Sequence, residues 1–271
     1  MSKKTVIYIA GLSHNGSTLL DFLLSHHPHI IGLGEIYSVI TGKTDNLEKT
    51  EGVCSCSLEL SRCPIWSDCL KKFKESPATG YQNQYRQIIQ AISSLKQDCL
   101  VDSSKNIRFL DQILPLVANQ TIALKIIFLI RDARGWAASY SDIGKKDGQV
   151  AKLPIHNLRV WYKDNQTIKR CLDQKKLDYL QISYEELIFN QRETIDRILK
   201  FAGLPLEKFS LTNKPNSHIA YGNRMKLTTD SQTINYDSRW LNRYWVNFFF
   251  ILMPRIFLWN KRNVPLPVYK R

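Results

Sequence analysis

The sequence predicts an α/β protein with a central parallel sheet that is flanked by helices. Short apolar runs alternate with segments whose apolar residues recur at the spacing of a helix. This alternation is typical of parallel strands that are joined by helices. A loop containing glycine also follows the first apolar run directly, as in α/β proteins that bind phosphate groups at a helix N-terminus.

The strands are predicted where apolar runs end in turn or polar residues, at residues 6–10, 30–33, 99–101, 124–130 and 179–182. Two helices have clear sequence signals. In the first, Tyr81 and Leu95 bound a stripe with three- and four-residue spacing. In the second, Asn190 and Glu193 form a predicted capping pair before a stripe that stops at Gly203.

Length and composition favour one domain over residues 1–271, since 271 residues with 44% hydrophobic content bury one large core. Residues 41–80 are the least regular part and are interpreted as a Cys-rich insertion. Residues 239–271 form a basic, apolar C-terminal extension that carries seven Lys and Arg and no acidic residue.

The net charge of +14 predicts an anionic ligand or partner. Nucleic acid fits the charge, but no recognised nucleic-acid motif supports it, so no nucleic-acid partner is predicted. The first residues lead straight into the predicted strand at 6–10 without a cleavage site for secretion. A cytoplasmic location is therefore predicted.

The loop after the first strand reads GLSHNGST and resembles a phosphate loop in which Ser17 stands at the lysine position. Gly11 and Gly16 allow backbone N–H groups to converge ahead of a helix that opens at Gly16, Ser17 and Thr18. Without the lysine, a triphosphate loses its main counter-charge, which favours a shorter anionic group. The alternative is a strand–helix turn that binds nothing.

The longer stretch GLSHNGSTLLDFLLSHHPHIIGLGEI resembles the segment with which sulfotransferases hold the phosphosulfate of 3′-phosphoadenosine 5′-phosphosulfate (PAPS). The resemblance implies a P-loop-type three-layer sandwich. His14 falls where many members carry Lys or Arg, and Asn15 replaces the usual Ser. The cofactor-binding residues implied in this loop are His14, Asn15, Gly16, Ser17 and Thr18.

Further segments match the same family in the expected order. Residues 125–139 resemble the 3′-phosphate site and imply that Arg131 and Ser139 bind that phosphate. The segment at 216–226 resembles the loop over the nucleotide and implies Asn223, Arg224 and Lys226 as further cofactor contacts. Residues 182–187 and 201–205 also match, and there Tyr184 and Glu185 are interpreted as bracing the sheet.

The predicted function is transfer of a sulfuryl group from PAPS to a hydroxyl acceptor by in-line displacement, leaving adenosine 3′,5′-bisphosphate. A carbohydrate, a lipid or a small molecule would each supply the hydroxyl. A P-loop-type nucleotide or small-molecule kinase is the alternative, and the absence of lysine at Ser17 counts against it.

Three residues are predicted to be catalytic. His14 would contact the bridging oxygen of the leaving nucleotide, although its charge depends on its neighbours. Lys105, at the end of a segment resembling a cofactor-side strand, would neutralise anionic oxygen. Glu35 follows the second predicted strand, where parallel sheets gather their ligands, and is predicted to be the base. The alternatives are a solvated loop histidine and a carboxylate at a helix start.

Four cysteines, Cys54, Cys56, Cys63 and Cys69, lie within sixteen residues. Their spacing differs from the paired pattern of common zinc sites, so no metal is predicted. A disulfide, a metal site and ordinary buried thiols stay open for this segment. Cys99 and Cys171 are interpreted as core residues.

The apolar run at 244–259 is interrupted at Pro254 and Arg255 and is too short to span a bilayer. Its aromatic and basic residues fit a peripheral contact with an anionic membrane. The alternative is a helix that packs on the core or lines the acceptor site.

Overall fold

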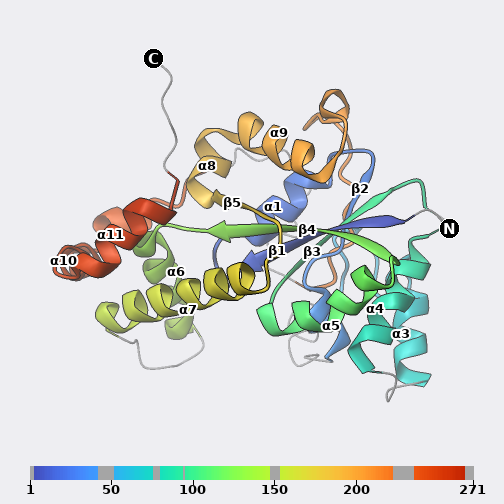
Figure 1. Cartoon of the computed structure of the whole chain (residues 1–271), viewed down its shortest axis with the longest axis horizontal. Helices are drawn as coiled ribbons and strands as arrows, with labels where there is room; N and C mark the ends of the chain where they lie inside the picture. Colours follow the sequence, from blue (N-terminus) through green and yellow to red (C-terminus); the bar gives the residue numbers. More distant parts are fainter. Residues whose placement is uncertain are drawn as a thin grey trace. The chain divides into compact units, whose positions relative to one another are not determined.

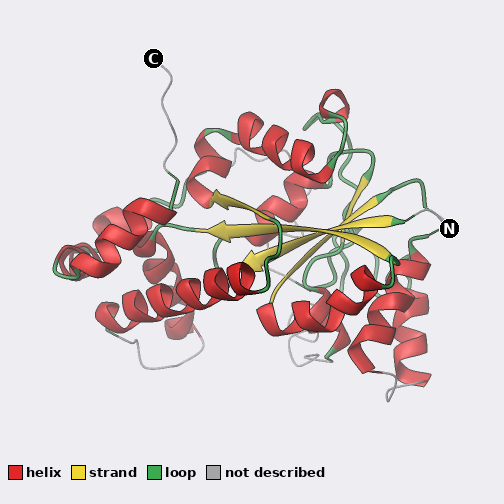
Figure 2. Cartoon of the chain, viewed as in Figure 1, coloured by secondary structure: helices red, strands yellow, loops and turns green. Residues whose placement is uncertain are grey.

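Five strands form one parallel sheet in the computed structural model of the chain, in the order β2-β3-β1-β4-β5 (Figure 1). The structure describes residues 3–41, 52–75, 80–93, 95–146, 153–221 and 235–265. The strands are β1 (Lys4–Gly11), β2 (Ile30–Gly32), β3 (Cys99–Lys105), β4 (Ile122–Ile130) and β5 (Tyr179–Ser183). Helices flank the sheet (Figure 2), so the predicted α/β class is confirmed.

All five predicted strands are present, and the largest difference is in β3. The apolar run predicts a strand that stops at residue 101, whereas β3 continues through three buried polar residues, Asp102, Ser103 and Ser104. Burial is tolerated there because the polar groups are hydrogen-bonded. Asp102 Oδ1 accepts from the Ser104 backbone N–H at 2.9 Å, and Asp102 Oδ2 accepts from the Tyr85 hydroxyl at 3.1 Å.

The chain divides into two compact units. The first comprises Met1–Ala10, Ser17–Ile126 and Ile198–Gln232. Its helices are α1 (Ser17–Leu24), α2 (Ile36–Ile40), α3 (Trp66–Glu75), α4 (Gly80–Ala91) and α5 (Ile107–Ala118), together with the end of α9 and the short η3 (Leu206–Lys208).

Packing in this first unit follows the amphipathic helices. Helix α1 packs on β2 and β3, and α2 lies against β3 and α4. Tyr85, Ile88 and Ile89 of α4 are buried, as the stripe predicts, whereas Tyr81 at its start is exposed and Leu95 lies beyond the end of the helix. Asn106 begins α5, where its side chain accepts from the backbone N–H groups of Arg108 and Phe109.

The second unit comprises Gly11–Gly16, Ile127–Arg197 and Thr233–Arg271. It contains α6 (Ala133–Lys146), α7 (Pro154–Gln174), α8 (Tyr184–Phe189), most of α9 (Gln191–Ala202), η5 (Arg239–Asn242), α10 (Tyr244–Ile251) and α11 (Pro254–Asn263). Helix α7 packs on α6, α10 and α11. A side-chain and backbone capping box between Ser183 and Glu186 starts α8 directly after β5.

The Cys-rich segment and the C-terminal segment both contain regular structure. Helix α3 lies within residues 41–80, and the C-terminal residues form η5, α10 and α11. Among the residues that the structure describes, no helix is long and apolar enough to cross a membrane. The division into a single domain with an insertion and an extension stays a prediction.

Candidate functional site

The glycine loop between β1 and α1 is held in a conformation that ordinary residues rarely adopt. Gly16 has a φ of +96°, and a Cβ atom added there would lie 2.6 Å from Cδ2 of the Tyr184 ring. His14 also lies in the left-handed region, with a φ of 64°. Glycine is therefore required at position 16 both by the backbone angle and by the close approach of Tyr184.

The second unit anchors this loop through three hydrogen bonds. Asn15 is buried, and its Nδ2 donates to the carbonyl oxygen of Leu129 in β4 at 2.8 Å. Trp136 Nε1 in α6 donates to the carbonyl oxygen of Ser13 at 2.7 Å. The amide of Asn15, predicted as a cofactor contact, thus fixes the loop to the end of β4.

Arg131, directly after β4, supplies the third of these bonds. Its Nη1 donates to the carbonyl oxygen of His14 at 3.1 Å, and its Nη2 pairs with Asp237 Oδ2 at 2.8 Å. The guanidinium lies over the ring of Tyr184, with its central carbon 4.5 Å from the ring centroid. The structure therefore brings the loop and Arg131 together, as the predicted site requires.

Within the described part of the chain, the guanidinium of Arg131 retains a donor without a partner. The residue is only 5% exposed, and its Nε atom is buried with no hydrogen-bond partner among the described residues. A buried donor without a partner is costly, and an anion that reaches it removes the cost. Hydrogen bonds from Arg239 and Arg131 hold the pKa of Asp237 well below its usual range. Arg131 thus already binds one anionic group, the Asp237 carboxylate.

Helix α6 adds an aromatic wall near His14. Trp136 and Tyr140 are stacked, with ring centroids 4.8 Å apart, and the His14 ring lies 6.3 Å from that of Tyr140. Ser139, predicted to bind phosphate with Arg131, is half-buried in the same helix. The structure therefore places His14 and Ser139 within the unit that contains Arg131.

Glu35 and Lys105 are brought together in the first unit, although seventy residues separate them. Lys105 Nζ lies 2.5 Å from Glu35 Oε1, and the two side chains are 10% and 20% exposed. The Ser38 hydroxyl donates to Glu35 Oε2 at 3.2 Å. Glu35 occupies the N-cap position of α2, but its side chain makes no capping hydrogen bond there, so both the base and the helix-start carboxylate stay open. The carboxylate is oriented by a cation and a hydroxyl.

The backbone that carries Glu35 rests on a buried carboxyl group. Gly34 has a φ of +72°, and its N–H donates to Asp21 Oδ2 at 2.9 Å. Burial raises the pKa of Asp21 to about 8, so this carboxyl group carries a proton at neutral pH. Protonation of Asp21 avoids a second buried negative charge near Asp102, whose carboxylate also raises the pKa of Asp21.

The structure describes only some of the remaining predicted site residues. Ser17, which is buried, and Thr18, which is half-buried, form the first turn of α1 in the first unit. Asn223, Arg224 and Lys226 lie outside the described residues.

Sequence reasoning missed Asp237, Trp136 and the contact that Tyr184 makes with Gly16. Tyr184 was interpreted only as a brace for the sheet, yet its ring contacts both the loop and Arg131. The aromatic residue Trp136 follows the predicted phosphate-binding arginine by five positions. That spacing was the available signal, whereas Asp237 has no signal in the sequence because it is distant from Arg131 along the chain.

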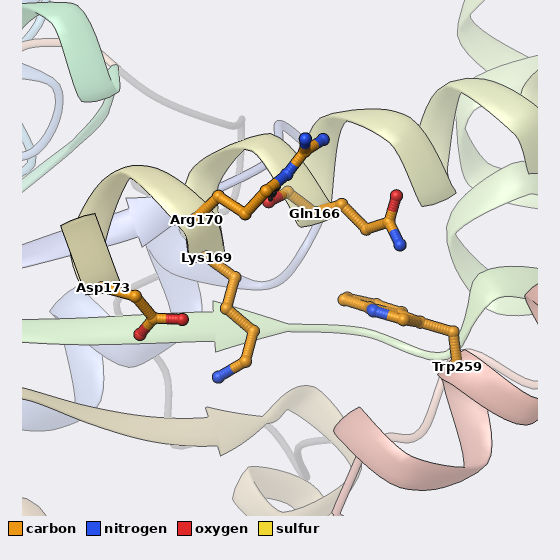
Figure 3. Close-up of a pocket in the computed structure, with 5 residues that line it drawn as sticks. All are labelled: Gln166, Lys169, Arg170, Asp173 and Trp259. Atoms are coloured by element: carbon orange, nitrogen blue, oxygen red, sulfur yellow. Dashed lines mark hydrogen bonds between the residues drawn. The ribbon is translucent and has the colours of Figure 1, made fainter.

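A separate hollow of about 350 Å³ in the second unit lies between α7 and α11 and contains no predicted site residue (Figure 3). It is lined by Gln166, Lys169, Arg170, Asp173 and Trp259. Lys169 Nζ donates to the Tyr179 hydroxyl at 2.8 Å, and that hydroxyl donates to Asp173 at 2.8 Å. These hydrogen bonds join α7 to β5, so Lys169 and Asp173 have a structural role in the wall of the hollow.

A parallel sheet with a glycine loop between β1 and α1 defines a P-loop-like α/β protein. The profile described as "Sulfotransferase family" matches residues 7–208. The chain therefore belongs to the sulfotransferase family, whose general reaction is sulfuryl transfer.

Solved structures agree on the fold. The sulfotransferase domain from the Synechococcus PCC 7002 olefin synthase matches with a TM-score of 0.56 and 18% identity, covering 89% of each chain. The sulfotransferase domain from the curacin biosynthetic pathway matches with a TM-score of 0.54 and 18% identity, covering 98% of this chain and 100% of the other. No curated protein gives a significant sequence match.

Proposed function

We propose that this protein is a PAPS-dependent sulfotransferase that sulfates a hydroxyl group. The observation that carries the choice of donor is Arg131, a buried guanidinium bonded to the phosphate-type loop and retaining a donor without a described partner. A terminal phosphate on the 3′ side of a nucleotide supplies the oxygens that such a guanidinium binds. Ser139 on α6 is proposed to contact the same phosphate.

The loop supplies the other half of donor binding. Backbone N–H groups of residues 14–18, at the start of α1, would bind the 5′ phosphosulfate without a lysine and without a magnesium ion. Asn223, Arg224 and Lys226 are proposed as further contacts on the sequence alone. A kinase would need a counter-charge for a triphosphate at position 17, where this chain has Ser17.

In the proposed reaction, the acceptor oxygen attacks sulfur while the bond from sulfur to the bridging oxygen breaks, and the nucleotide leaves in line. Glu35 takes the proton of the acceptor hydroxyl, and His14 stabilises the charge on the departing oxygen. Lys105 orients Glu35 through their ion pair and is proposed to neutralise sulfuryl oxygen.

Thermal unfolding with different nucleotides tests the donor. At about 100 times its Kd, adenosine 3′,5′-bisphosphate should add about 2.7 kcal/mol to the free energy of unfolding, which raises the melting temperature by about 5–10 °C. Adenosine 5′-monophosphate, which lacks the 3′-phosphate, is the matched control and should give a much smaller shift. A shift from ATP with magnesium that equals or exceeds the bisphosphate shift would support the kinase alternative instead.

The acceptor is proposed to be a hydroxyl-bearing carbohydrate, lipid or small molecule, and the protein is proposed to act in the cytoplasm. No nucleic-acid partner is proposed, because the net charge of +14 is the only feature in its favour. A phosphosulfate ligand and the surface described next both account for positive charge.

We further propose that the C-terminal helices contact anionic membrane. One side of α10 and α11 is packed, with Val246, Phe250 and Ile256 buried. The other side exposes a group of large apolar residues that we call the C-terminal apolar face: Tyr244, Trp245, Phe248, Ile251, Leu252, Phe257 and Leu258. Arg255, Lys261 and Arg262 are exposed in the same segment. Aromatic residues beside cations suit the headgroup region of an anionic bilayer.

Co-sedimentation with vesicles tests this contact. The chain should bind vesicles that contain phosphatidylserine and should bind pure phosphatidylcholine vesicles much less. Replacing Trp245 and Phe248 together with serine should abolish binding, whereas Leu153→Ser, at an equally exposed apolar residue of the same unit, should not. A wild-type chain that stays in the supernatant and instead self-associates through these residues contradicts the proposal.

A further inference from the structure

Three cysteines and one histidine meet in the first unit, outside the residues that we assign to sulfuryl transfer. One ligand atom from each of Cys54, Cys56, Cys63 and His218 lies within 4.8 Å of the corresponding atoms of the other three. The Sγ atoms of Cys54 and Cys63 are 3.6 Å apart, and Cys63 Sγ lies 3.3 Å from His218 Nδ1. Cys54 and Cys63 are buried, and the other two are half-buried.

These separations match a tetrahedral metal site. Zinc–sulfur bonds of about 2.3 Å and zinc–nitrogen bonds of about 2.0–2.1 Å place two sulfur ligands about 3.8 Å apart and a sulfur and a nitrogen about 3.6 Å apart. A disulfide would need its sulfur atoms about 2.05 Å apart. All six cysteines of the chain are free thiols in the structure, so the four side chains already have nearly the spacing of a zinc ligand set.

We propose that Cys54, Cys56, Cys63 and His218 bind one Zn²⁺ ion. Thiolates together with an imidazole favour zinc among the common divalent ions, because soft sulfur ligands select against magnesium and calcium. Four protein ligands leave no position for water or substrate, so the site is structural. This inference does not depend on the identity of the sulfuryl donor.

The local backbone is folded as a compact ligand loop. Cys54 N–H donates to the carbonyl oxygen of Leu58 at 2.8 Å, and Ser57 N–H donates to that of Cys54 at 2.9 Å. Ser57 has a φ of 69°, in the left-handed region. Cys63 N–H donates to the carbonyl oxygen of Leu60 at 3.3 Å, and Ser67 N–H donates to that of Cys63 at 3.0 Å. These bonds fix the backbone that carries two of the sulfur ligands.

The fourth ligand, His218, is also held in place by hydrogen bonds of its backbone. His218 N–H donates to the carbonyl oxygen of Gly32 in β2 at 2.7 Å, and Trp66 Nε1 donates to the carbonyl oxygen of His218 at 2.6 Å. Three residues later, the carbonyl oxygen of Tyr221 accepts from the N–H of Glu35 at 3.2 Å. A zinc ion here would therefore tie the Cys-rich segment to the chain that supports Glu35.

The sequence does not predict this site, because its fourth ligand is not the nearby cysteine. Cys69 lies in α3 and is buried, but it is outside the cluster. His218 takes its place from a position 155 residues after Cys63. The prediction of no metal came from comparing cysteine spacings alone, which cannot include a histidine so distant in the chain.

Elemental analysis of the full chain, purified under reducing conditions with zinc in the growth medium, tests the proposal. We expect close to one zinc per chain in the wild type and in Cys69→Ala, the matched control for a buried thiol outside the cluster. Cys63→Ser and His218→Ala should each retain far less zinc than the wild type, because each removes one of the four ligands that a closed structural site requires. A wild type with no more zinc than Cys63→Ser overturns the proposal.

Cobalt replacement gives a second answer that needs no variant. Wild-type chain from which zinc has been removed by a chelator should take up one Co²⁺ and show thiolate-to-cobalt charge transfer with the strong visible bands of tetrahedral coordination. Zinc should then displace the cobalt and abolish those bands. Weak octahedral bands alone would overturn the assignment. So would mass mapping that finds Cys54 and Cys63 joined as a disulfide in freshly isolated protein.

Discussion

Replacing Glu35 with glutamine is expected to lower kcat by about 10²–10⁴-fold, the usual contribution of general base catalysis. Glutamine keeps the size of the side chain and can still accept from Ser38, but it cannot take the acceptor's proton. The affinity for adenosine 3′,5′-bisphosphate should stay within about twofold, because a base that acts only in the transition state adds little to ground-state binding. Transfer of label from PAPS and calorimetric titration measure the two quantities.

Two further variants separate the role of Glu35 as the base from the role of the residues that orient its carboxylate. Ser38→Ala removes the hydroxyl that donates to Glu35 Oε2 and should lower kcat far less than Glu35→Gln. Lys105→Met removes the ion pair and should also lower kcat, because the Glu35 carboxylate then loses the cation that orients it. Equal losses of kcat and of bisphosphate affinity in folded Glu35→Gln would show that Glu35 supports the fold and is not the base.

The second large effect is expected for Arg131→Ala, which should weaken binding of adenosine 3′,5′-bisphosphate by about 10²–10³-fold. Hydrogen bonds to charged groups contribute about 1.5–3 kcal/mol each, and a bidentate guanidinium supplies two of them. Binding requires Arg131 to exchange its partner Asp237 for phosphate, so part of the gain is already offset by the broken ion pair. Isothermal calorimetry at fixed ionic strength measures the change.

The controls for this prediction keep either the charge or the fold. Arg131→Lys retains the charge but not the planar pair of donors and should recover only part of the affinity. Arg159→Ala removes an exposed positive charge from α7 of the same unit and should leave affinity nearly unchanged. If the folded Arg131→Ala chain bound the bisphosphate as tightly as the wild type, the proposed 3′-phosphate site would be wrong.

Much of the fold follows from local sequence, because strands and helices differ in apolar period. The run at residues 124–130 has no polar interruption except Lys125, and it forms most of β4. Strand β3 was predicted too short because Asp102, Ser103 and Ser104 read as a turn. Their burial depends on partners such as Tyr85 of α4, which no local pattern identifies.

The same distinction between local sequence and distant contacts applies to the candidate site. The glycine loop and the strand that ends at Arg131 are contiguous segments, so the sequence could identify them by motif and spacing. Tyr184 against Gly16, Asp237 on Arg131 and His218 beside Cys63 join residues that are far apart in the chain. Their proximity comes from chain crossings and side-chain packing.

By itself the sequence determined the α/β class, the five strands, the phosphate-type loop and the family, because each is written in adjacent residues through apolar period, glycine placement or motif. Only the tertiary structure decided that Lys105 pairs with Glu35, that Arg131 retains an unsatisfied donor among the described residues, and that a histidine completes the cysteine cluster. The physical reason is that hydrogen bonds and metal coordination act over about 2–3 Å in space, whatever the distance along the chain.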